Sequence, residues 1–402
     1  MFLTSITLQK SGIIFLDALA YVILIITQQG SLHKCIFNYK ALVIGGFMAD
    51  NKQHFHGSDL EKVAAHYTID EDKIINYSGN VNPLGLSQNI QSTLSKHIDL
   101  IAKYPDRDYN NLRAAISKYI NVDKEDIIVG NGSTELISLF IKALQPKNAL
   151  IIGPTYSEYE REIFINNGKS RYFPLLEEED FNINLEHLKE HLAEETDLLV
   201  ICNPNNPTSS AINRRTLRSI LDFCLECDVD VVIDETYVEF ADDVKNISAV
   251  SLAQFYSNLF IIRGVSKFFA APGLRLGYGI SGNPSMLHTI NSMKNPWTIN
   301  SLAAFAGELM LQDDHYIAET RALIHQERVR LTELIKGWDD VKTYPAHGNF
   351  LLIKFLKDEH LSYDIFEDLL KDGLMTRDAS SFPFLSNKFL RFCILKPEDN
   401  NR

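Results

Sequence analysis

Short apolar runs alternate with longer segments of mixed polarity through the middle of the chain. Five runs rich in Val, Ile and Leu stand at residues 126–129, 149–152, 198–202, 229–233 and 259–263. Each run ends in a cluster of Gly, Pro, Asn or acidic residues, and helix-compatible stretches such as Ser133–Leu144 and Arg214–Cys227 lie between most of them. Buried parallel strands form continuous apolar runs of this kind, and crossover helices connect them. The pattern therefore predicts an α/β fold, with a mainly parallel sheet and helices on both of its faces.

One apolar stretch near the N-terminus does not belong to this pattern. Ile13–Ile26 is nearly all apolar, but it is shorter than a usual membrane span and Asp17 interrupts it. A secretory leader needs a cleavage site of small residues, and none is clear after the run. Met48 offers a better start, because the codons of Gly45-Gly46 could be a translated ribosome-binding site. Among a membrane anchor, a cleaved leader and an over-extended reading frame, we favour the last, and we expect residues 1–47 to lie outside the folded protein.

The composition is that of a globular protein in water. Of the 402 residues, 45% are hydrophobic and 23% are charged, and the formal net charge is −13. This acidic balance argues against a nucleic-acid-binding protein, which needs a basic surface. The five cysteines are scattered and odd in number, which indicates a reducing compartment, and no Cys/His/Asp cluster completes a metal site. We therefore expect a cytoplasmic protein that needs no metal and no membrane.

Residues with functional chemistry stand directly after four of the five runs, where ligands bind in sheets of this class. After the first run, Gly130–Glu135 combines glycines with a helix start, whose free N–H groups suit a phosphate. After the third run, Asn203–Thr208 contains two prolines that fix a rigid turn and can aim an asparagine amide at a ligand. Taken alone, these segments could also be a capped helix and a plain turn.

The other two clusters carry charge. Asp234 leaves a buried strand, where a carboxylate needs a positive partner such as a pyridinium nitrogen, although it could also cap the next segment. Lys267 follows the fifth run beside aromatic residues, and removal from water would lower its pKa and suit a Schiff-base nucleophile. Arg275 could add bidentate charge to a phosphate site. With the Tyr237 phenol, these groups describe one ligand, which is pyridoxal phosphate.

This set of residues resembles the fold-type I pyridoxal-phosphate enzymes of the aspartate aminotransferase superfamily, from about His54 to Lys396. The resemblance implies that Lys267 is the Schiff-base lysine and that Asp234 pairs with the pyridine nitrogen of the cofactor. It also implies a role for three residues at the ring: Tyr237 and Asn206 at the 3′-oxygen, and Tyr156 stacked on the ring face. The phosphate contacts that it implies come from Gly132, Ser133, Thr134, Ser266 and Arg275, and from Tyr104 of the neighbouring subunit in a homodimer.

Two branches of the superfamily share these elements, the histidinol-phosphate aminotransferases and the threonine-phosphate decarboxylases. Four segments are more similar to the decarboxylases: residues 54–57, 78–85, 267–273 and 295–300. This similarity implies decarboxylation of O-phospho-L-threonine to the aminopropanol phosphate linker of cobalamin, with phosphoserine as another possible substrate. A histidinol-phosphate or related aminotransferase is the alternative.

The resemblance also implies substrate contacts. Arg391 would bind the substrate carboxylate near Asn80 and Asn206, and Arg377 would bind the substrate phosphate with His56 and Gly57. Three residues depart from the pattern of the relatives. Gly264 stands where Ser or Thr is common, which would remove one phosphate contact; Ser58 and Ser209 replace glycines.

The expected organisation follows that of the superfamily. Residues 48–95 form an N-terminal arm and part of a small domain, residues 96–298 form the large cofactor domain, and residues 299–402 complete the small domain. The chain ends at Arg402, where relatives continue into a closing helix, and we expect that helix to be truncated.

Overall fold

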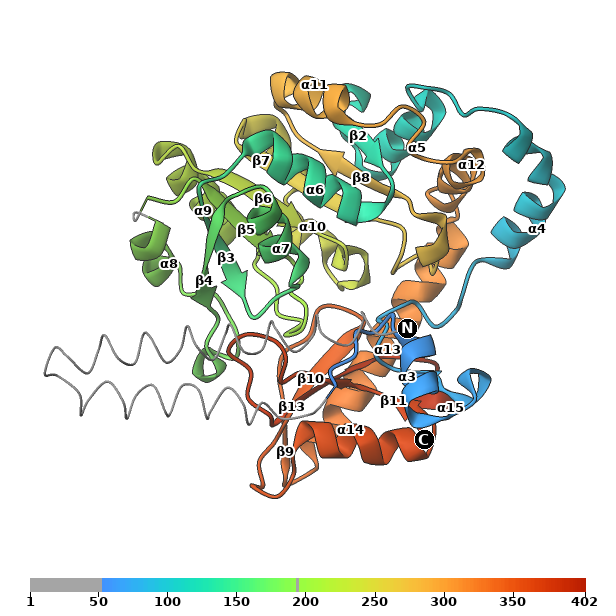
Figure 1. Cartoon of the computed structure of the whole chain (residues 1–402), viewed down its shortest axis with the longest axis vertical. Coiled ribbons are helices and arrows are strands. Elements are labelled where there is room, and N and C mark those ends of the chain that lie inside the picture. The colour runs from blue at the N-terminus through green and yellow to red at the C-terminus, as the bar shows by residue number, and fades with distance from the viewer. Residues whose placement is uncertain (1–52, 193–194) are drawn as a thin grey trace, which may run out of the picture. The chain divides into compact units, whose positions relative to one another are not determined.

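The computed structural model describes residues 53–192 and 195–402 (Figure 1). The interpretation of residues 1–47 concerns a segment outside the described residues. His54–Arg402 form one compact unit, so the domain limits at residues 96 and 299 stay predictions.

The larger sheet has seven strands in the order β2-β8-β7-β6-β5-β3-β4. Its strands are β2 (Ile127–Gly130), β3 (Asn148–Gly153), β4 (Lys169–Pro174), β5 (Leu198–Cys202), β6 (Asp230–Asp234), β7 (Leu259–Gly264) and β8 (Gly277–Ile280). All neighbours pair in parallel except β8, which is antiparallel to both β7 and β2. The five apolar runs are all strands, with limits within one residue of the prediction, and the mainly parallel sheet is confirmed.

Strands β4 and β8 are not marked by an apolar run. β4 lies at one edge of the sheet, and most of its residues are partly exposed, so its sequence is mixed. β8 is short and contains Gly277 and Gly279. A Cβ at Gly279 would lie 2.9 Å from the Phe140 ring, so the glycine allows a helix to pack closely on this strand.

Helices cover both faces of the large sheet, as the alternation of runs and helical stretches predicts. One face packs against α6 (Gly132–Leu144), α7 (Glu158–Ile165) and α11 (Pro284–Met293). The other face packs against α5 (Asn110–Ile120), α8 (Leu185–Leu192), α9 (Arg214–Glu226), α12 (Ser301–Met310) and α13 (Asp314–Lys336). Because side chains alternate along a strand, Val232 and Asp234 of β6 face the same side as Val200 and Cys202 of β5, which is the side of α7.

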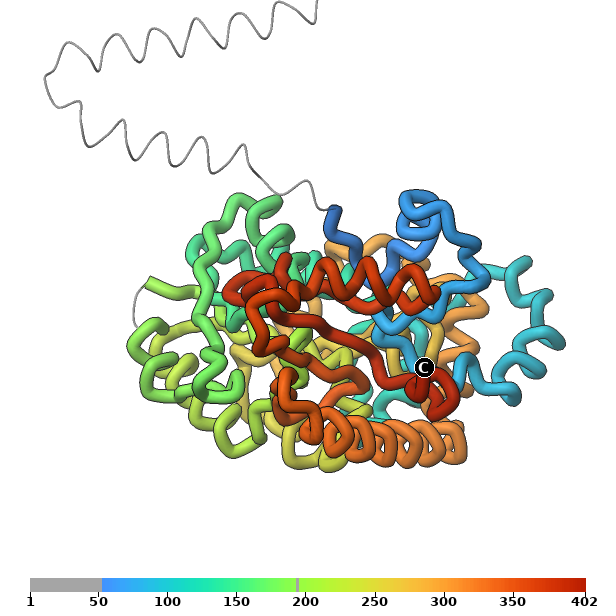
Figure 2. The backbone as a smooth tube through the Cα atoms, turned by 90° about the horizontal axis from the view of Figure 1, so that it is seen from below, coloured from blue at the N-terminus to red at the C-terminus, as the bar shows by residue number. Residues whose placement is uncertain are grey.

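A second sheet is built mainly from the C-terminal part of the chain, in the order β12-β13-β10-β9. Its strands are β9 (Val341–Thr343), β10 (Phe350–Phe355), β12 (Arg377–Asp378) and β13 (Phe389–Cys393). An early segment of the chain joins this C-terminal part, because β1 (Ile75–Asn76) pairs in parallel with β11 (Leu374–Met375) (Figure 2). The remaining helices are α3 (Leu60–Tyr67), α4 (Gln88–Lys96), α10 (Val244–Ile247), α14 (Ser362–Lys371) and α15 (Pro397–Asn400).

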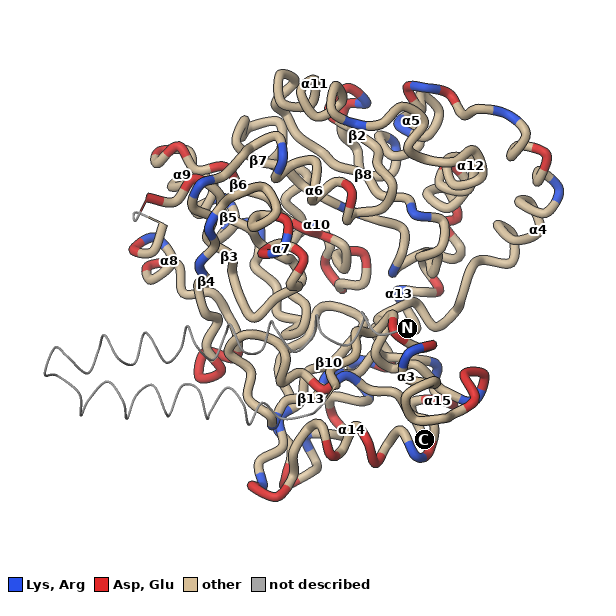
Figure 3. Tube along the Cα trace, in the orientation of Figure 1, with Lys and Arg blue, Asp and Glu red and all other residues tan. Residues whose placement is uncertain are grey.

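Charged residues are spread over the described elements, and neither sign is confined to one layer (Figure 3). Within residues 53–192 and 195–402, no helix combines the length and the apolar character that crossing a bilayer would require. The same residues contain no group of three or more His, Cys, Asp or Glu side chains arranged to hold a metal ion.

Candidate active site

The sheet brings the predicted strand-end residues together along one edge. Asp234 is the last residue of β6, and its partner in the parallel register is Cys202, the last residue of β5. β7, which precedes Lys267 by three residues, pairs with β6 on its other side. The loops that carry Asn206 and Lys267 therefore leave the sheet on either side of Asp234.

Asp234 is almost fully buried, and hydrogen bonds hold both of its carboxylate oxygens. Its Oδ1 accepts from the backbone N–H and the hydroxyl of Thr236, at 2.9 and 2.5 Å, and its Oδ2 accepts from the Tyr159 hydroxyl at 2.7 Å. Burial raises the pKa of this carboxyl, and the hydrogen bonds from Thr236 and Tyr159 oppose that rise. A cationic ring nitrogen would further stabilise the ionised form.

Lys267 is held by a segment far from it in sequence. Its Nζ donates to the carbonyl of Gly79 at 2.7 Å, and its own carbonyl accepts from the backbone N–H of Asn82 at 3.0 Å. Burial, and then the positive charge of Arg391, lower the pKa of this lysine to about 8. At pH 7 about a tenth of this lysine is therefore the free amine, far more than for an ordinary lysine, and the free amine is the form that attacks a carbonyl carbon.

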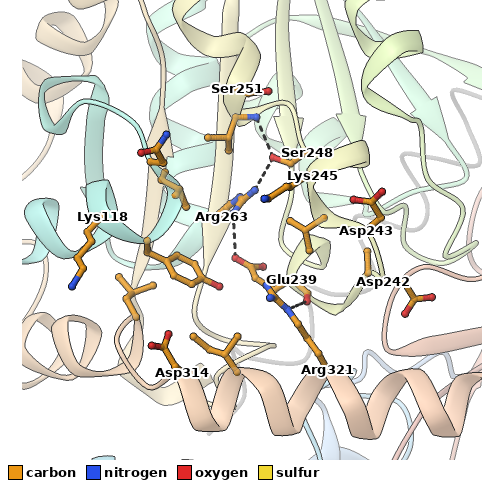
Figure 4. Close-up of a pocket in the computed structure, with 18 of the residues that line it drawn as sticks. Lys118, Glu239, Asp242, Asp243, Lys245, Ser248, Ser251, Arg263, Asp314 and Arg321 are labelled. Atoms are coloured by element: carbon orange, nitrogen blue, oxygen red, sulfur yellow. Dashed lines mark hydrogen bonds and ion pairs between the residues drawn. The ribbon is translucent and has the colours of Figure 1, made fainter.

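An ion-pair network anchors the strand that leads to Lys267. Arg263 of β7 is buried, and its guanidinium lies 2.7 Å from Glu235 and 3.5 Å from Glu239. Arg263 and Glu239 border a hollow of about 770 Å³ that is also lined by residues of α5, α10 and α13 (Figure 4). None of the site residues predicted from the sequence lines this hollow, which adjoins the ion-pair network instead.

The residues predicted to contact the cofactor phosphate, called here the phosphate cup (Gly132, Ser133, Thr134, Ser266 and Arg275), lie where α6 begins or in the loop after β7. Gly132 has a φ of +79°, and a Cβ there would lie 2.7 Å from the Arg275 guanidinium, so arginine and glycine backbone are in close contact. Ser133 and Thr134 follow in the first turn of α6, which offers free N–H groups, and Ser266 lies in the loop after β7. A glycine backbone, an arginine and a helix start suit a phosphate group.

Gly277 is expected to be essential for this cup. A Cβ at Gly277 would lie 2.7 Å from both the Gly132 carbonyl carbon and the Ser133 amide nitrogen. These are backbone atoms, so they cannot move away without a shift of the chain. We expect Gly277→Ala to weaken pyridoxal-phosphate binding roughly 5- to 150-fold, because backbone shifts from overpacking cost about 1–3 kcal/mol. Titration of the apoenzyme with the cofactor measures this.

Gly264→Ala is the matched control. A Cβ at Gly264 would have its closest contact at 3.6 Å, which is an ordinary van der Waals distance. The site therefore has room for the Ser or Thr that relatives commonly have there. Equal loss of affinity in both variants would contradict the assignment of Gly277 to the cup wall.

The residues implied for the cofactor ring lie around the same strand ends. Asn206 is buried, and its Oδ1 accepts a hydrogen bond from Arg391. Tyr237 is buried against Phe350, with ring centroids 5.0 Å apart. Tyr156 follows β3, is partly exposed, and meets the Tyr159 ring edge-on at 5.7 Å.

Arg377 and Arg391 face each other across the small sheet. They are directly opposite residues of the antiparallel strands β12 and β13, so their side chains leave the same face of the sheet. Both are buried, and burial lowers the pKa of each; at Arg377 the charge of Arg391 adds to this and brings the pKa to about 10. Within the described part of the chain, neither guanidinium has a carboxylate within ion-pair distance.

Several buried polar atoms beside these arginines have no hydrogen-bond partner among the described residues. They are both amide atoms of Asn80, the hydroxyl of Ser78 and the Nε of Arg391. A buried polar atom without a partner is costly, and it normally marks a place that a ligand or water completes. The unpaired groups, the phosphate cup and the shielded lysine together fit pyridoxal phosphate with an anionic substrate.

Of the remaining predicted residues, His56 and Tyr104 are exposed and Gly57 is partly buried. Gly57 is packed so closely against Ser78 that a Cβ would lie 2.1 Å from the Ser78 carbonyl oxygen, which accepts from Arg391. Tyr104 is 82% exposed, and its ring contacts Trp297 at 4.9 Å between centroids. Among the described residues, no hydrogen bond or ring contact joins Tyr104 to the strand-end cluster.

The structure adds residues that the sequence did not single out. Tyr159 and Thr236 bond Asp234, and Gly79 accepts from Lys267. Tyr159 had a detectable signal, because it is an aromatic residue in an otherwise charged turn of α7. Ser209 adopts a φ of +60° where relatives have glycine, and its hydroxyl accepts from the backbone N–H of Gly348 at 2.9 Å.

Comparison with known proteins agrees with this geometry. The family model described as aminotransferase class I and II matches residues 72–402. A protein of Caldanaerobacter subterraneus subsp. tengcongensis, named for threonine-phosphate decarboxylase activity, is 39% identical over 321 residues, which are 80% of this chain and 86% of that protein. The threonine-phosphate decarboxylase of Salmonella typhimurium is 28% identical, and the match covers 86% of this chain and 94% of that protein.

A solved structure of the second branch is also similar. The histidinol-phosphate aminotransferase from Clostridium acetobutylicum has a TM-score of 0.76 and 32% identity, over 81% of this chain and 95% of that chain. Both branches share the fold-type I architecture and the requirement for pyridoxal phosphate. The chain therefore belongs to the aminotransferase class I and II family of pyridoxal-phosphate-dependent enzymes and, within it, resembles the threonine-phosphate decarboxylases.

Proposed function

We propose that this enzyme is a carboxy-lyase that converts O-phospho-L-threonine to 1-aminopropan-2-yl phosphate and CO2. The product would serve as the linker of the cobalamin nucleotide loop, as the similarity to threonine-phosphate decarboxylases implies. Phosphoserine, which would give ethanolamine phosphate, differs by one methyl group, and a methyl group changes affinity by only about 1–3 kcal/mol.

The pair of buried arginines carries this proposal. A buried cation without a counter-ion is unstable, so two of them side by side call for a ligand with two anionic groups. Phosphothreonine has a carboxylate on Cα and a phosphate on the adjacent carbon. Arginine binds both kinds of anion through two parallel N–H bonds, and burial strengthens each of these contacts.

The two anions would take different arginines. Arg391 would receive the carboxylate, because its free Nε lies in the cluster that also holds the unpaired amide of Asn80. Arg377 would receive the phosphate together with His56 and the backbone at Gly57. Asp378, the neighbour of Arg377, is engaged by the ring of His54 and the hydroxyls of Ser362 and Ser380. Arg377 donates one hydrogen bond to the Ser381 hydroxyl at 2.8 Å, and its other N–H groups would bind the phosphate.

Binding of both substrate anions by the two arginines would decide the type of reaction. Bound pyridoxal phosphate supplies an electron sink for the one Cα bond that stands perpendicular to its ring. Two anchored anions prevent rotation about Cα, so Arg391 and Arg377 can select the Cα–carboxylate bond. Lys267 Nζ, with a pKa of about 8, can hold the proton that replaces CO2 on Cα.

Aminotransfer from histidinol phosphate is the second candidate, favoured by the similarity to the Clostridium acetobutylicum aminotransferase. Histidinol phosphate has a phosphate but no carboxylate, so it would leave one of the two arginines without an anion. The amino acceptor of such a reaction, the dicarboxylic acid 2-oxoglutarate, would occupy both.

A product assay separates these candidates. Purified holoenzyme is incubated with phosphothreonine, with phosphoserine, or with histidinol phosphate and 2-oxoglutarate. Release of CO2 from phosphothreonine supports the proposal, whereas glutamate formation from the third mixture supports the aminotransferase. Absence of CO2 with both phosphoamino acids overturns the proposal.

We also propose a homodimer in which Tyr104 of each subunit completes the phosphate cup of the other. Its exposed ring beside Trp297 supports this, because the family resemblance gives the tyrosine a role across the interface. Mixed dimers test the proposal. A Lys267→Ala chain and a Tyr104→Ala chain, each inactive or weak alone, are expected to regain about a quarter of wild-type activity when refolded together, since half the dimers have one intact site. Activity that does not rise on mixing would contradict the arrangement.

A further inference from the structure

The carboxylate of Asp234 is fixed by two side chains to which the family resemblance assigns no role. Tyr159 donates its hydroxyl to Oδ2 at 2.7 Å, and Thr236 donates its hydroxyl to Oδ1 at 2.5 Å. The backbone N–H of Thr236 also donates to Oδ1 at 2.9 Å. A carboxylate has about four acceptor positions, so three donors leave one for a further N–H group.

These donors stand in for the cation that a buried carboxylate usually has. No Lys or Arg side chain in the described part of the chain pairs with Asp234, although the residue is only 4% exposed. The titratable groups that face it are phenols and a thiol: Tyr159 and Tyr156 at α7, Tyr237 in the loop after β6, and Cys202 at the end of β5. Each of them is neutral near pH 7, so hydrogen bonds alone oppose the effect of burial.

The proton on the Tyr159 oxygen has one good acceptor. The phenol is fully buried on the α7 face of the sheet, and the neighbouring thiol of Cys202 donates its own hydrogen to the carbonyl of Pro204 at 3.3 Å. The Tyr159 hydroxyl therefore donates to Asp234 rather than accepting from it. Donation to a carboxylate favours the ionised state.

We infer that Tyr159 and Thr236 are a positioning pair, whose two hydroxyls keep Asp234 ionised and oriented so that it can hold a proton on the pyridine nitrogen of the cofactor. The inference rests on the assignment of Asp234 to that nitrogen. Both residues act through Asp234, and their removal is expected to change cofactor binding and its pH dependence before it changes the fold.

The test uses the full-length protein with Tyr159→Phe, Thr236→Val and both changes together. The dissociation constant of pyridoxal phosphate is measured by absorbance and fluorescence from pH 5 to pH 9. We expect each single change to weaken binding roughly 10- to 100-fold at neutral pH, because a hydrogen bond to a charged group is lost. Thr236→Ser, which keeps the hydroxyl, is expected to bind as the wild type does.

The pH dependence distinguishes positioning from a structural role. Loss of a donor raises the pKa of Asp234, so the carboxylate becomes protonated at a higher pH and cofactor affinity falls earlier on acidification. We call this acidic part of the affinity profile the acid limb. A tenfold loss of affinity corresponds to a shift of about one pH unit in its position. Because both donors act on one carboxylate, the double variant is expected to deviate from the product of the two single effects.

Tyr119→Phe is the matched control, since the Tyr119 hydroxyl is buried without a partner among the described residues and lies outside the site. It is expected to leave the affinity and the acid limb unchanged. Circular dichroism of each variant checks the fold, and Thr236→Val provides the measurement if Tyr159→Phe does not fold.

Two outcomes are distinguishable. In the first, Asp234→Asn weakens cofactor binding but the folded Tyr159 and Thr236 variants match the wild type in affinity and acid limb. The positioning role of Tyr159 and Thr236 is then wrong, and the assignment of Asp234 stands. If Asp234→Asn itself has no effect, the assignment of Asp234 is wrong and the inference falls with it.

Discussion

Replacement of Lys267 by alanine is expected to abolish turnover. The side chain of Lys267 carries the buried amine at the strand ends. Its backbone carbonyl and its Nζ both form hydrogen bonds with the segment that contains Gly79 and Asn82. Loss of a group that bonds covalently during the reaction lowers kcat by roughly 10⁴- to 10⁶-fold in well-studied enzymes. Lys267→Arg keeps a positive charge but not a nucleophilic amine, so it is expected to be equally inactive.

Borohydride reduction provides a measurement independent of turnover. In the wild type it should fix the cofactor to the peptide that contains Lys267, and in Lys267→Ala it should fix none. Lys294→Ala serves as the control, because burial lowers the pKa of Lys294 as well, although it donates to the carbonyl of Val129 and has no place in the proposed site. Labelling and turnover that survive in Lys267→Ala would refute the assignment.

The pH dependence of cofactor attachment follows from the same lysine. Its pKa of about 8 lies below the usual 10.5, so the reactive free amine accumulates as the pH rises through about 8. In the window between these two values, the unfolded chain keeps a proton that the folded chain has lost. For this group, the free energy of unfolding of the apoenzyme therefore increases with pH across that window.

Replacement of Arg391 by glutamine is expected to be the second-largest loss. The change removes the cation proposed for the substrate carboxylate, and it also leaves the carbonyl of Ser78 and the amide of Asn206 without a donor. Removal of one partner of a buried charged contact costs about 2–5 kcal/mol, or roughly 30- to 5,000-fold in kcat/KM. Steady-state assays of CO2 release measure this loss.

Arg377→Gln is the informative comparison, because the two arginines are proposed to bind different anions. Loss of Arg377 should reduce kcat/KM for phosphothreonine but have little effect on the slow reaction of threonine, which has no phosphate. Loss of Arg391 should impair both substrates. If Arg377→Gln impairs threonine and phosphothreonine by the same factor, its assignment to the phosphate is wrong.

The strands that hold the cofactor residues could be predicted because they are buried on both faces. Such strands need Val, Ile and Leu at every position, and the polar residues that follow them are conspicuous. β8 could not be found in this way, because Gly277 and Gly279 are there to let other backbone and side-chain atoms approach. A glycine that is required because neighbouring atoms pack closely against it gives no local sequence signal of a strand.

The candidate site was only partly predictable for a related reason. Motif spacing could suggest that Arg377 and Arg391 both belong to the site. Whether the two residues lie directly opposite each other depends on the register of β12 against β13. The carbonyl of Gly79 that receives Lys267 and the phenol that bonds Asp234 are likewise contacts over 188 and 75 positions of sequence. Long-range pairs of this kind follow from the packing of whole elements, and a single sequence does not record that packing.

The pairing of β1 with β11 has a consequence for when the protein becomes an enzyme. Every strand of the seven-stranded sheet lies before residue 281, so a growing chain can complete the sheet and present Asp234 and Lys267 early in synthesis. The two arginines proposed to hold the substrate are supplied only by β12 and β13, within the last 26 residues, 377–402. Just before them, β11 must return to β1, at Ile75–Asn76, which was made much earlier. Because β12 and β13 are made last, we expect the residues proposed for the cofactor to be in place before the residues proposed to select the substrate.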